Sequence, residues 1–410
     1  MKKILLLFSV VAMAFNAFAA SGYLTVDPLT VRPGKTGNLV IRYHFTLDDN
    51  VPLAGYQVDV YVPNDVKINL ANSTLGEGYY DDGYALMTNQ KPDQDGYGIY
   101  GLVGFPMPID GKMTVIKGSE GILLNVPVTV PASAQSGDVI EGYLRKITFA
   151  TQKPTQIDLE DVPFTINVDE DVIEAVIDEN ATVAPAAIEN ANVKVLRTIK
   201  GGEWSTICLP FDMDAAQVKA AFGDDVVIKD FADWEALTLD DDDSYIYRIN
   251  LSFSPVDAIE AHHPYIIKTS ADVSEFVVKD ATVTTATDIV TEVKHGRREI
   301  SSMIGTYVAD TTVPDMCLFL SGNNFWYSTG NTKMKGLRAY FDIYDVLTKI
   351  EDAGAKIGFV FDGEATGITN IDKQATNDKI YSVGGQYMGT DTSRLQRGVY
   401  IVNGKKVVKK

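Results

Sequence analysis

The strongest constraint on the fold is a series of short segments in which apolar and polar residues alternate. Clear cases are residues 39–43 and 56–62, which are also rich in β-branched and aromatic side chains. Successive side chains on a β-strand point to opposite faces, so this alternation predicts strands with one buried face. Turn-forming pairs such as Asp95-Gly96 follow at intervals of about ten residues. Many short strands separated by turns predict a β-sandwich over residues 20–168.

The second half of the chain also has strand patterns, for example at residues 193–197 and 357–361. One segment instead has the signals of a helix. Asp214 can cap its first turn, Gln217 can complete the cap, and Gly223 can end it. We therefore expect a second, β-rich domain with one short helix. The fold class predicted for the whole chain is mostly β.

Changes in composition divide the chain into five segments. An apolar leader precedes the sandwich, and an acidic stretch separates the sandwich from the second domain. The last segment is expected to be a small β C-terminal tail, and it is basic, with eight Lys or Arg and two Asp between residues 373 and 410. The expected segments are a signal peptide at 1–19, the sandwich at 20–168, a linker at 169–180, the β-rich domain at 181–362 and the tail at 363–410.

The leader has the pattern of a secretory signal peptide. Two lysines precede an apolar run at residues 4–15, and Ala17 and Ala19 supply the small side chains that a signal peptidase reads. We expect export and a mature chain that begins at Ala20; an uncleaved membrane anchor is the alternative. No other window approaches the roughly eighteen apolar residues of a membrane helix, so no membrane span is expected in the mature chain.

The charge of the chain restricts its partners. It has 36 Lys and Arg residues against 55 Asp and Glu residues, which gives a formal net charge of −19 at pH 7. Proteins bind nucleic acids through basic stripes that neutralise phosphates, so no nucleic-acid partner is expected. Hydrophobic residues make up 45% of the chain, which is enough for each domain to bury a core.

Four features of the first domain follow one another in a recognisable order. They are Val31-x-Pro33-Gly34 before a strand, the run Ala-Gly-Tyr-Gln-Val-Asp-Val-Tyr-Val-Pro at 54–63, an apolar strand at 122–128, and the turn Ala-Gln-Ser-Gly at 134–137. In this order they resemble the cohesin-like and related carbohydrate-binding sandwich domains. The resemblance implies an immunoglobulin-like sandwich of two sheets with a binding role.

Four motifs of the second domain also occur together. They are EWSTICLPF at 203–211, HPYIIK at 263–268, GTY at 305–307 and MKGLRAYF at 334–341. They resemble a β-rich domain, without assigned chemistry, that recurs in exported proteins of anaerobic Gram-negative bacteria of the gut and mouth. The resemblance implies a scaffold or spacer and no catalytic residue.

The tail contains three strand-like segments, at residues 367–371, 380–386 and 397–402. Their pattern is similar to that of the C-terminal sorting domains of type IX secretion. The similarity implies that the export machinery at the outer membrane is a partner of the tail. The expected location is the cell surface or the medium, with the periplasm as the alternative.

The usual signatures of catalysis are missing from the sequence. None of its four His residues lies in a His-Glu-x-x-His motif, and neither Gly-x-Ser-x-Gly nor the phosphate-binding Gly-x-x-x-x-Gly-Lys-Ser/Thr occurs. We therefore expect a protein that is not an enzyme and has no cofactor. The alternative is a glycan-active hydrolase, which needs only a pair of carboxylates.

Two acidic segments and one His pair are candidates for a metal site, and each has a simpler interpretation. Residues 93–96, Asp-Gln-Asp-Gly, approach a calcium loop, but Gly104 stands where the closing Glu belongs. The four consecutive Asp at 240–243 would repel one another and fit a solvated hairpin tip better. His262 and His263 are adjacent, so on a strand they would face opposite sides. No metal site is expected.

Cys208 and Cys317 are the only cysteines, and both stand in apolar runs. In an oxidising compartment they could form a disulfide, whereas apolar surroundings are typical of buried thiols. The sequence leaves both alternatives open.

The most suggestive binding feature is a group of aromatic residues in a Gly- and Asp-rich stretch of the first domain. Its members are Tyr79, Tyr80, Tyr84, Tyr97 and Tyr100, with Phe105 nearby. Tyrosine rings suit the faces of sugars and are enriched in the binding hot spots of protein interfaces, although tyrosine is also a common strand residue. We expect a non-catalytic exported protein that binds a glycan or a cell-surface protein through this group. A structural adhesin or matrix component is a further alternative.

Overall fold

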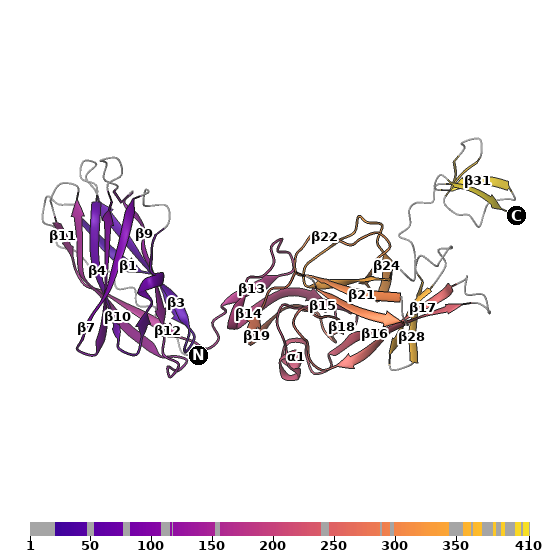
Figure 1. The fold of residues 1–410 in the computed structure, drawn as a ribbon, viewed down its shortest axis with the longest axis horizontal. Coiled ribbons are helices and arrows are strands. Elements are labelled where there is room, and N and C mark those ends of the chain that lie inside the picture. Colours follow the sequence, from indigo (N-terminus) through magenta and orange to yellow (C-terminus); the bar gives the residue numbers. More distant parts are fainter. Residues whose placement is uncertain are drawn as a thin grey trace. The chain divides into compact units, whose positions relative to one another are not determined.

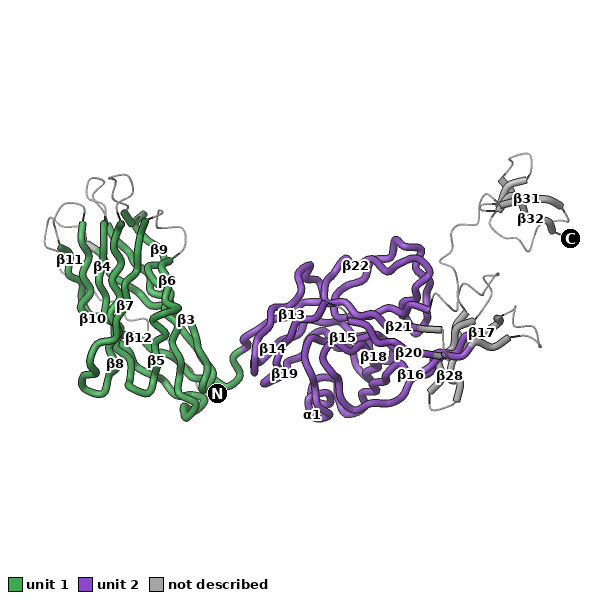
Figure 2. The backbone as a smooth tube through the Cα atoms, viewed as in Figure 1, with its two compact units in different colours: residues 1–172 green, residues 173–410 purple. Residues whose placement is uncertain are grey.

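The structure of the protein, a computed structural model, divides into two compact units, residues 1–172 and residues 173–410 (Figure 2). Both units consist mainly of β-strands, which confirms the predicted fold class (Figure 1). The expected signal peptide at 1–19 lies outside the described residues. The structure describes residues 21–46, 53–76, 83–107, 115–116, 118–151, 156–238, 246–287, 289–295, 299–343, 356–361, 364–370, 380–382, 387–389, 398–402 and 405–409.

Unit 1 is built from twelve described strands and one short 3-10 helix, η1 (Leu70–Asn72). The strands are β1 (Ser21–Val26), β2 (Leu29–Val31), β3 (Thr36–Thr46), β4 (Leu53–Pro63), β5 (Lys67–Ile68), β6 (Thr74–Leu75), β7 (Tyr84–Gln94), β8 (Tyr97–Pro106), β9 (Glu120–Thr129), β10 (Val139–Thr151), β11 (Gln156–Leu159) and β12 (Val162–Val168). The smaller sheet has the order β1-β3-β9-β5, with β6 paired to β9. The larger sheet has the order β2-β12-β10-β4-β8-β7, with β11 paired to β10.

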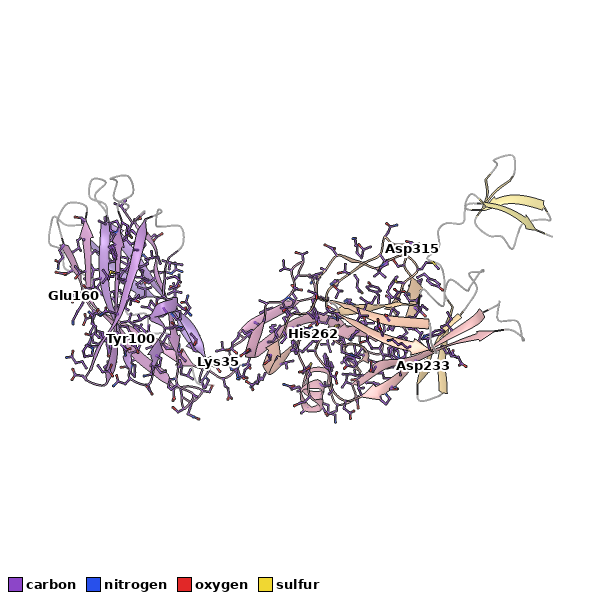
Figure 3. The ribbon with its side chains drawn as sticks, in the orientation of Figure 1. Lys35, Tyr100, Glu160, Asp233, His262 and Asp315 are labelled. Carbon is purple, nitrogen blue, oxygen red and sulfur yellow. The ribbon has the colours of Figure 1, made fainter. Side chains whose placement is uncertain are left out.

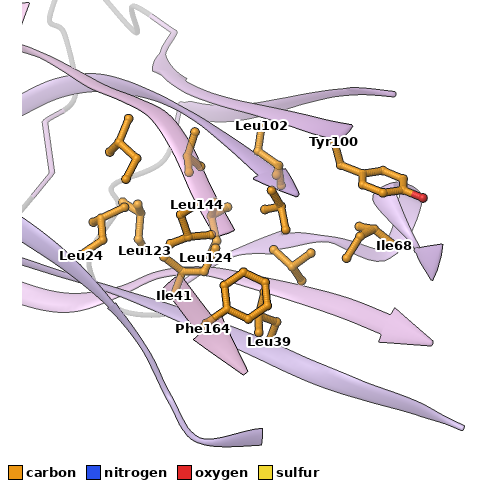
Figure 4. Packing of buried hydrophobic residues seen from close by; sticks show 14 of the residues in the cluster. Leu24, Leu39, Ile41, Ile68, Tyr100, Leu102, Leu123, Leu124, Leu144 and Phe164 are labelled. Carbon is orange, nitrogen blue, oxygen red and sulfur yellow. The ribbon is translucent and has the colours of Figure 1, made fainter. Parts of the chain in front are cut away.

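One hydrophobic core lies between these two sheets. Leu39 and Ile41 of the smaller sheet and Leu102 and Leu144 of the larger sheet are completely buried in it (Figure 4). Along β3 the buried residues alternate with more exposed ones, as the sequence pattern predicts. Unit 1 is therefore the expected β-sandwich.

The alternation of inward-facing and outward-facing side chains along β10 is interrupted at Lys146. Lys146 has a positive φ of 50°, and the pairing of β10 with β4 shifts register at this point. A β-bulge of this kind inserts one residue, so Leu144 and Ile147 both point into the core although they are three positions apart. Phe149 follows on the same inner side and is also completely buried. The bulge thus allows one strand to line the core on both sides of the shift.

Unit 2 contains five sheets within the described part of the chain. Their orders are β13-β14-β19, β15-β18-β16-β17-β27-β28, β20-β21-β26-β23-β24, β22-β25 and β30-β29-β31-β32. The strands are β13 (Ala175–Asp178), β14 (Ile188–Ile199), β15 (Trp204–Cys208), β16 (Val227–Thr238), β17 (Ile246–Val256), β18 (Pro264–Lys268), β19 (Val273–Val283), β20 (Val290–His295), β21 (Glu299–Thr306), β22 (Thr311–Thr312), β23 (Leu318–Ser321), β24 (Asn324–Tyr327), β25 (Lys333–Met334), β26 (Arg338–Asp342), β27 (Lys356–Phe361), β28 (Glu364–Asn370), β29 (Ile380–Ser382), β30 (Tyr387–Gly389), β31 (Gly398–Val402) and β32 (Lys405–Lys409).

The predicted helix is α1 (Ala215–Phe222), and its ends are those that the sequence indicates. The Asp214 side chain accepts a hydrogen bond from the Gln217 N–H (2.8 Å), and the Gln217 side chain accepts one from the Asp214 N–H (2.9 Å), which forms a capping box. Gly223 ends the helix with a φ of 94°. Within the described residues, no helix is long and apolar enough to cross a membrane.

The second domain is flanked by two segments, and each of them forms a strand that pairs with a strand of the domain. The acidic segment 169–180, expected to be a linker, contains β13, which runs parallel to β14. Glu179, directly after β13, is buried. At the other end, β28 pairs with β27, so the first strand of the expected tail extends a sheet of the second domain. The four Asp at 240–243 lie outside the described residues.

Both cysteines are buried free thiols, the second of the two alternatives that the sequence leaves open. Cys208 ends β15 in the core of unit 2, and Cys317 packs with Val313 and Met334. Burial raises the pKa of each thiol to about 12. Neither cysteine is therefore a thiolate near neutral pH, and a nucleophilic role is not supported.

We expect neither thiol to react with DTNB in the native protein at about pH 8, because burial restricts access and keeps the sulfur protonated. After unfolding in guanidinium without a reductant, two thiols per chain should react. The absorbance of the released product measures both numbers. A disulfide would release no thiol after unfolding, which would contradict the structure.

Candidate functional site

The tyrosines that the sequence suggests as a binding group are spread over unit 1. Three lie on the hairpin of β7 and β8, whereas Tyr79 and Tyr80 lie outside the described residues. Tyr84 is at the open end of the hairpin, where it pairs with Pro106. Tyr97 stands next to the turn at the opposite end. Tyr84 and Tyr97 are therefore separated by the length of the hairpin.

Two of these tyrosines are held by the fold itself. The Tyr84 hydroxyl donates a hydrogen bond to the Ala54 carbonyl oxygen (2.9 Å), and the Tyr84 ring stacks on that of Tyr56 with centroids 6.5 Å apart. Tyr100 is 4% exposed and belongs to the core between the sheets (Figures 3 and 4). In contrast to the expectation, Tyr100 offers no ring face to a ligand, because the pleat of β8 turns it inward.

Tyr97 belongs to a different group of side chains, on the face of the larger sheet that points away from the core. This group, which we call the aromatic cluster, consists of Tyr61 from β4, Tyr97 from β8, and Tyr143 and Arg145 from β10. Tyr61 and Tyr143 are directly opposed on neighbouring strands. Tyr97 meets Tyr143 edge-on, with centroids 5.8 Å apart and ring planes at 70°. Tyr143 and Arg145 share a face because they are two residues apart on one strand.

The Arg145 guanidinium covers two rings of the aromatic cluster. Its Cζ lies 4.9 Å from the centroid of Tyr61 and 4.6 Å from that of Tyr143, within the range of a cation–π interaction. Its Nε is 3.3 Å from the carboxylate of Asp161. Tyr61 is 4% exposed, whereas the Arg145 side chain is 39% exposed. The cluster is thus tightly packed at its base and presents a cation to solvent.

An ion pair fixes the neighbouring strands on the same face. Asp59 of β4 is completely buried, and Lys91 of β7 reaches both of its carboxylate oxygens, at 2.6 and 2.7 Å. β8 runs between these two strands, and its Gly101 leaves the necessary space. A Cβ there would lie 2.9 Å from the Lys91 side chain and 3.2 Å from that of Asp59. The pair therefore ties three strands into a rigid support for the aromatic cluster.

A groove of about 350 Å³ borders the aromatic cluster at Tyr97. Asp65, Asp138 and Glu141 line it, and the described residues around it include no Lys or Arg. The face therefore combines a cation, the partly buried rings of Tyr97 and Tyr143, and a negatively charged hollow. Such a mixture favours a ligand that has both apolar and basic groups.

The three groove carboxylates also bear on the alternative of a glycan hydrolase. All three residues are exposed, and the Asp138 carboxylate accepts a hydrogen bond from the Gln135 N–H (2.8 Å). A general acid needs surroundings that keep its carboxyl group protonated near neutral pH, usually an apolar pocket. Exposed carboxylates lack such surroundings, so the groove does not favour hydrolysis.

The adjacent histidines of unit 2 take part in separate networks. His262 (Figure 3) contacts the Tyr307 hydroxyl through Nδ1 (2.6 Å) and the Thr284 hydroxyl through Nε2 (2.7 Å). His263 contacts the Asp230 carboxylate through Nε2 (2.7 Å). Within the described residues, no three His, Cys, Asp or Glu side chains gather closely enough to hold a metal ion.

Tyr61, Tyr143 and Arg145 are not among the residues predicted from the sequence, although a signal for them exists. Each stands on a predicted strand at a position that alternates with apolar core residues, so each should face solvent. Large aromatic side chains on the solvent side of a strand indicate a contact surface. The pairing of β4 with β8 and β10, which brings these side chains together, cannot be predicted from the sequence alone.

Comparison with protein-family models and with curated proteins finds no match. Comparison with solved structures finds cohesin modules. One is the sixth cohesin of scaffoldin B from Acetivibrio cellulolyticus, solved in complex with a Cel5 dockerin. The match has 14% sequence identity and a TM-score of 0.29, and it covers 36% of this chain and 99% of that chain. A second is a cohesin module of a family 33 glycoside hydrolase from Clostridium perfringens, with 13% identity and a TM-score of 0.27; the match covers 37% of this chain and 96% of that chain. A third is a non-cellulosomal cohesin from Archaeoglobus fulgidus, with 9% identity and a TM-score of 0.26; the match covers 36% of this chain and 91% of that chain.

Proposed function

We propose that unit 1 is a non-catalytic module that binds a protein partner through the aromatic cluster and the acidic groove beside it. The observation that supports the proposal is the aromatic cluster, a group of tyrosines with one arginine on the solvent side of a rigid sheet. Tyr and Arg are enriched at the energetic centres of protein interfaces. Because their positions are fixed before binding, the entropic cost of association is reduced.

The arrangement of the rings favours a protein over a glycan. A sugar ring stacks on an aromatic face that is open to solvent. Here Arg145 covers Tyr61 and Tyr143, and Tyr97 packs edge-on with Tyr143. The partner that we propose therefore offers an apolar side chain to Tyr97, which lines the groove, and a Lys or Arg to the groove carboxylates.

The double change Tyr143→Ala and Arg145→Ala should weaken binding of the partner by about 30-fold to 700-fold, the loss expected for two hot-spot residues. The partner is first captured from cell envelopes with the wild-type protein and then titrated, as purified protein, in a calorimeter. Thermal unfolding of the variant should change by only a few degrees, because neither side chain belongs to the core.

Tyr23→Ala is the matched control for this experiment. Tyr23 is 46% exposed on the smaller sheet and stacks on His44, with centroids 4.8 Å apart. Because it is outside the aromatic cluster, its removal should leave binding unchanged. Full binding by the double variant, or a glycan-array signal that depends on Tyr143, would overturn the proposal of a protein partner.

We propose further that the protein is exported to the cell surface or the medium and that the basic tail directs the last step. The leader at 1–19 and the strand pattern of the tail at 363–410 support this proposal. The mature protein should begin at Ala20, and protease added to intact cells should digest it. A chain that begins at Met1, or complete protection by the outer membrane, would contradict surface export.

A further inference from the structure

Unit 2 contains a pocket of about 220 Å³ with an unusual charge. Lys333, Lys335 and Arg338 line this pocket, which we call the cationic pocket, and the described lining residues include no Asp or Glu. The whole chain has a net charge of −19, so three converging cations are not an average sample of its surface. Like charges held together repel one another, and a bound anion would relieve that repulsion.

Beside the pocket, one carboxylate is shared by three cations. Glu179 accepts a hydrogen bond from Lys335 at its Oε1 (3.0 Å). At its Oε2 it accepts hydrogen bonds from Arg338 (2.8 Å) and from the buried Arg197 (3.2 Å). Lys333 adds a fourth positive charge at the pocket. A single Glu therefore leaves the site with a net positive charge.

Two observations on the arginines agree with this shortage of negative charge. The Nε–H of Arg338 is buried and donates no hydrogen bond to any residue that the structure describes. Burial and the nearby charge of Arg338 lower the pKa of Arg197 to about 9, although Glu179 acts in the opposite direction. A buried donor without an acceptor is destabilising, which agrees with a site that lacks negative charge.

The remaining walls of the cationic pocket are of mixed character. Phe319, Leu320 and Met334 contribute apolar surface, and Ser321 and Thr332 contribute hydroxyl groups. The volume lies below the range of about 300–1,000 Å³ that is typical for drug-sized ligands. It is suited to an anion whose body is about the size of one sugar ring.

We infer that the cationic pocket binds a small carboxylated sugar, with its carboxylate on the three cations and its ring against Phe319. Guanidinium and ammonium groups form charge-assisted hydrogen bonds with carboxylates, which are stronger than bonds between neutral groups. The hydroxyls of Ser321 and Thr332 suit the hydroxyl groups of the ring. The inference concerns unit 2 alone and does not depend on the function proposed for unit 1.

Titration of the full-length protein with D-glucuronate and D-galacturonate tests the inference, with D-glucose and D-galactose as the neutral counterparts. Chemical shifts of unit 2 residues measure binding. We expect millimolar affinity for at least one uronate, at least about tenfold tighter than for the neutral sugars, and a decrease as salt rises. Failure of both uronates to bind, or equal binding of the neutral sugars, would overturn it.

Lys333→Gln tests the site without disturbing Glu179, because Lys333 donates its hydrogen bond to the Thr312 hydroxyl instead. The change should weaken uronate binding about threefold or more and leave thermal unfolding unaltered. Lys294→Gln, which removes an exposed lysine of β20 outside the pocket, is the control and should have no effect.

Equal affinity for acetate or sulfate would reveal an adventitious anion site only. Tighter binding of an Asp-rich peptide would reassign the pocket to a protein ligand.

Discussion

Replacing Glu179 by Gln should lower the free energy of unfolding of unit 2 by about 3–5 kcal/mol. Glu179 is 2% exposed, and its carboxylate accepts a hydrogen bond from Arg197, which is completely buried. The guanidinium also donates to the carbonyl oxygens of Leu337 (3.4 Å) and Thr206 (2.8 Å), but these groups carry no charge. Without the carboxylate, a buried cation loses its counter-ion, and that loss is far more costly than the loss of a surface ion pair.

The same carboxylate gives the stability of unit 2 a pH dependence. Burial by itself would raise the pKa of Glu179, but the hydrogen bond from Lys335 and the charges of Arg338 and Arg197 hold it below its ordinary value of 4.5. A carboxyl group of this kind contributes stability above its pKa in the unfolded chain, and the contribution is lost as pH falls through the lower pKa of the folded state. Unit 2 of the wild type should therefore become less stable on acidification below about pH 4.5, and the Glu179→Gln variant should show less of this loss.

Tryptophan fluorescence in urea measures this change selectively, because all three Trp residues of the chain lie in unit 2, at positions 204, 234 and 326. Glu275→Gln is the matched control. Glu275 is exposed, and its ion pair with Lys194 (2.8 Å) lies at the surface, where such a pair contributes less than about 1 kcal/mol. If both changes had the same small effect, Glu179 would not be needed to bury Arg197.

Glu179 also shows how far the fold can be predicted from the sequence. Strand alternation and the helix cap depend on neighbours in the chain, so both were predictable. An acidic segment, by contrast, is expected to be solvated, and only the pairing of β13 with β14 brings Glu179 next to Arg197. The bulge at Lys146 is a second feature that the sequence does not predict. No local sequence pattern indicates that β10 contains an extra residue there, which keeps Phe149 in the core.

The candidate site, too, has one part that can be predicted from the sequence and one part that cannot. The predicted turn at Asp95-Gly96 implies a hairpin, and a hairpin already places Tyr84 and Tyr97 at opposite ends. The tyrosine group is predicted from closeness in sequence. Closeness in sequence is a poor guide to distance along a strand, because the strand rises more than 3 Å per residue. The contact of Tyr97 with Tyr143 joins residues from β8 and β10 across β4, and such long-range pairing was not predictable from one sequence.

Replacing Phe149 by Ala should lower the free energy of unfolding of unit 1 by about 3–5 kcal/mol. Phe149 is completely buried, and its ring meets that of Phe45 edge-on at 4.7 Å and that of Tyr56 at 5.7 Å between centroids. Phe45 belongs to the smaller sheet and Tyr56 to the larger one, so the ring contributes to the packing of both. Its removal leaves a cavity that the hydrogen-bonded sheets cannot close by moving together.

Amide hydrogen exchange in the strands of unit 1 measures this loss, and Tyr143→Ala is the control on the same strand. Tyr143 also loses an aromatic ring, but it lies on the solvent side of β10, so the change should cost about 1 kcal/mol or less. Partner binding should show the reverse order: Tyr143→Ala weakens it, whereas Phe149→Ala reduces only the folded fraction. Equal costs for the two changes would mean that β10 does not separate a core face from a binding face, and the proposed function of unit 1 would lose its structural basis.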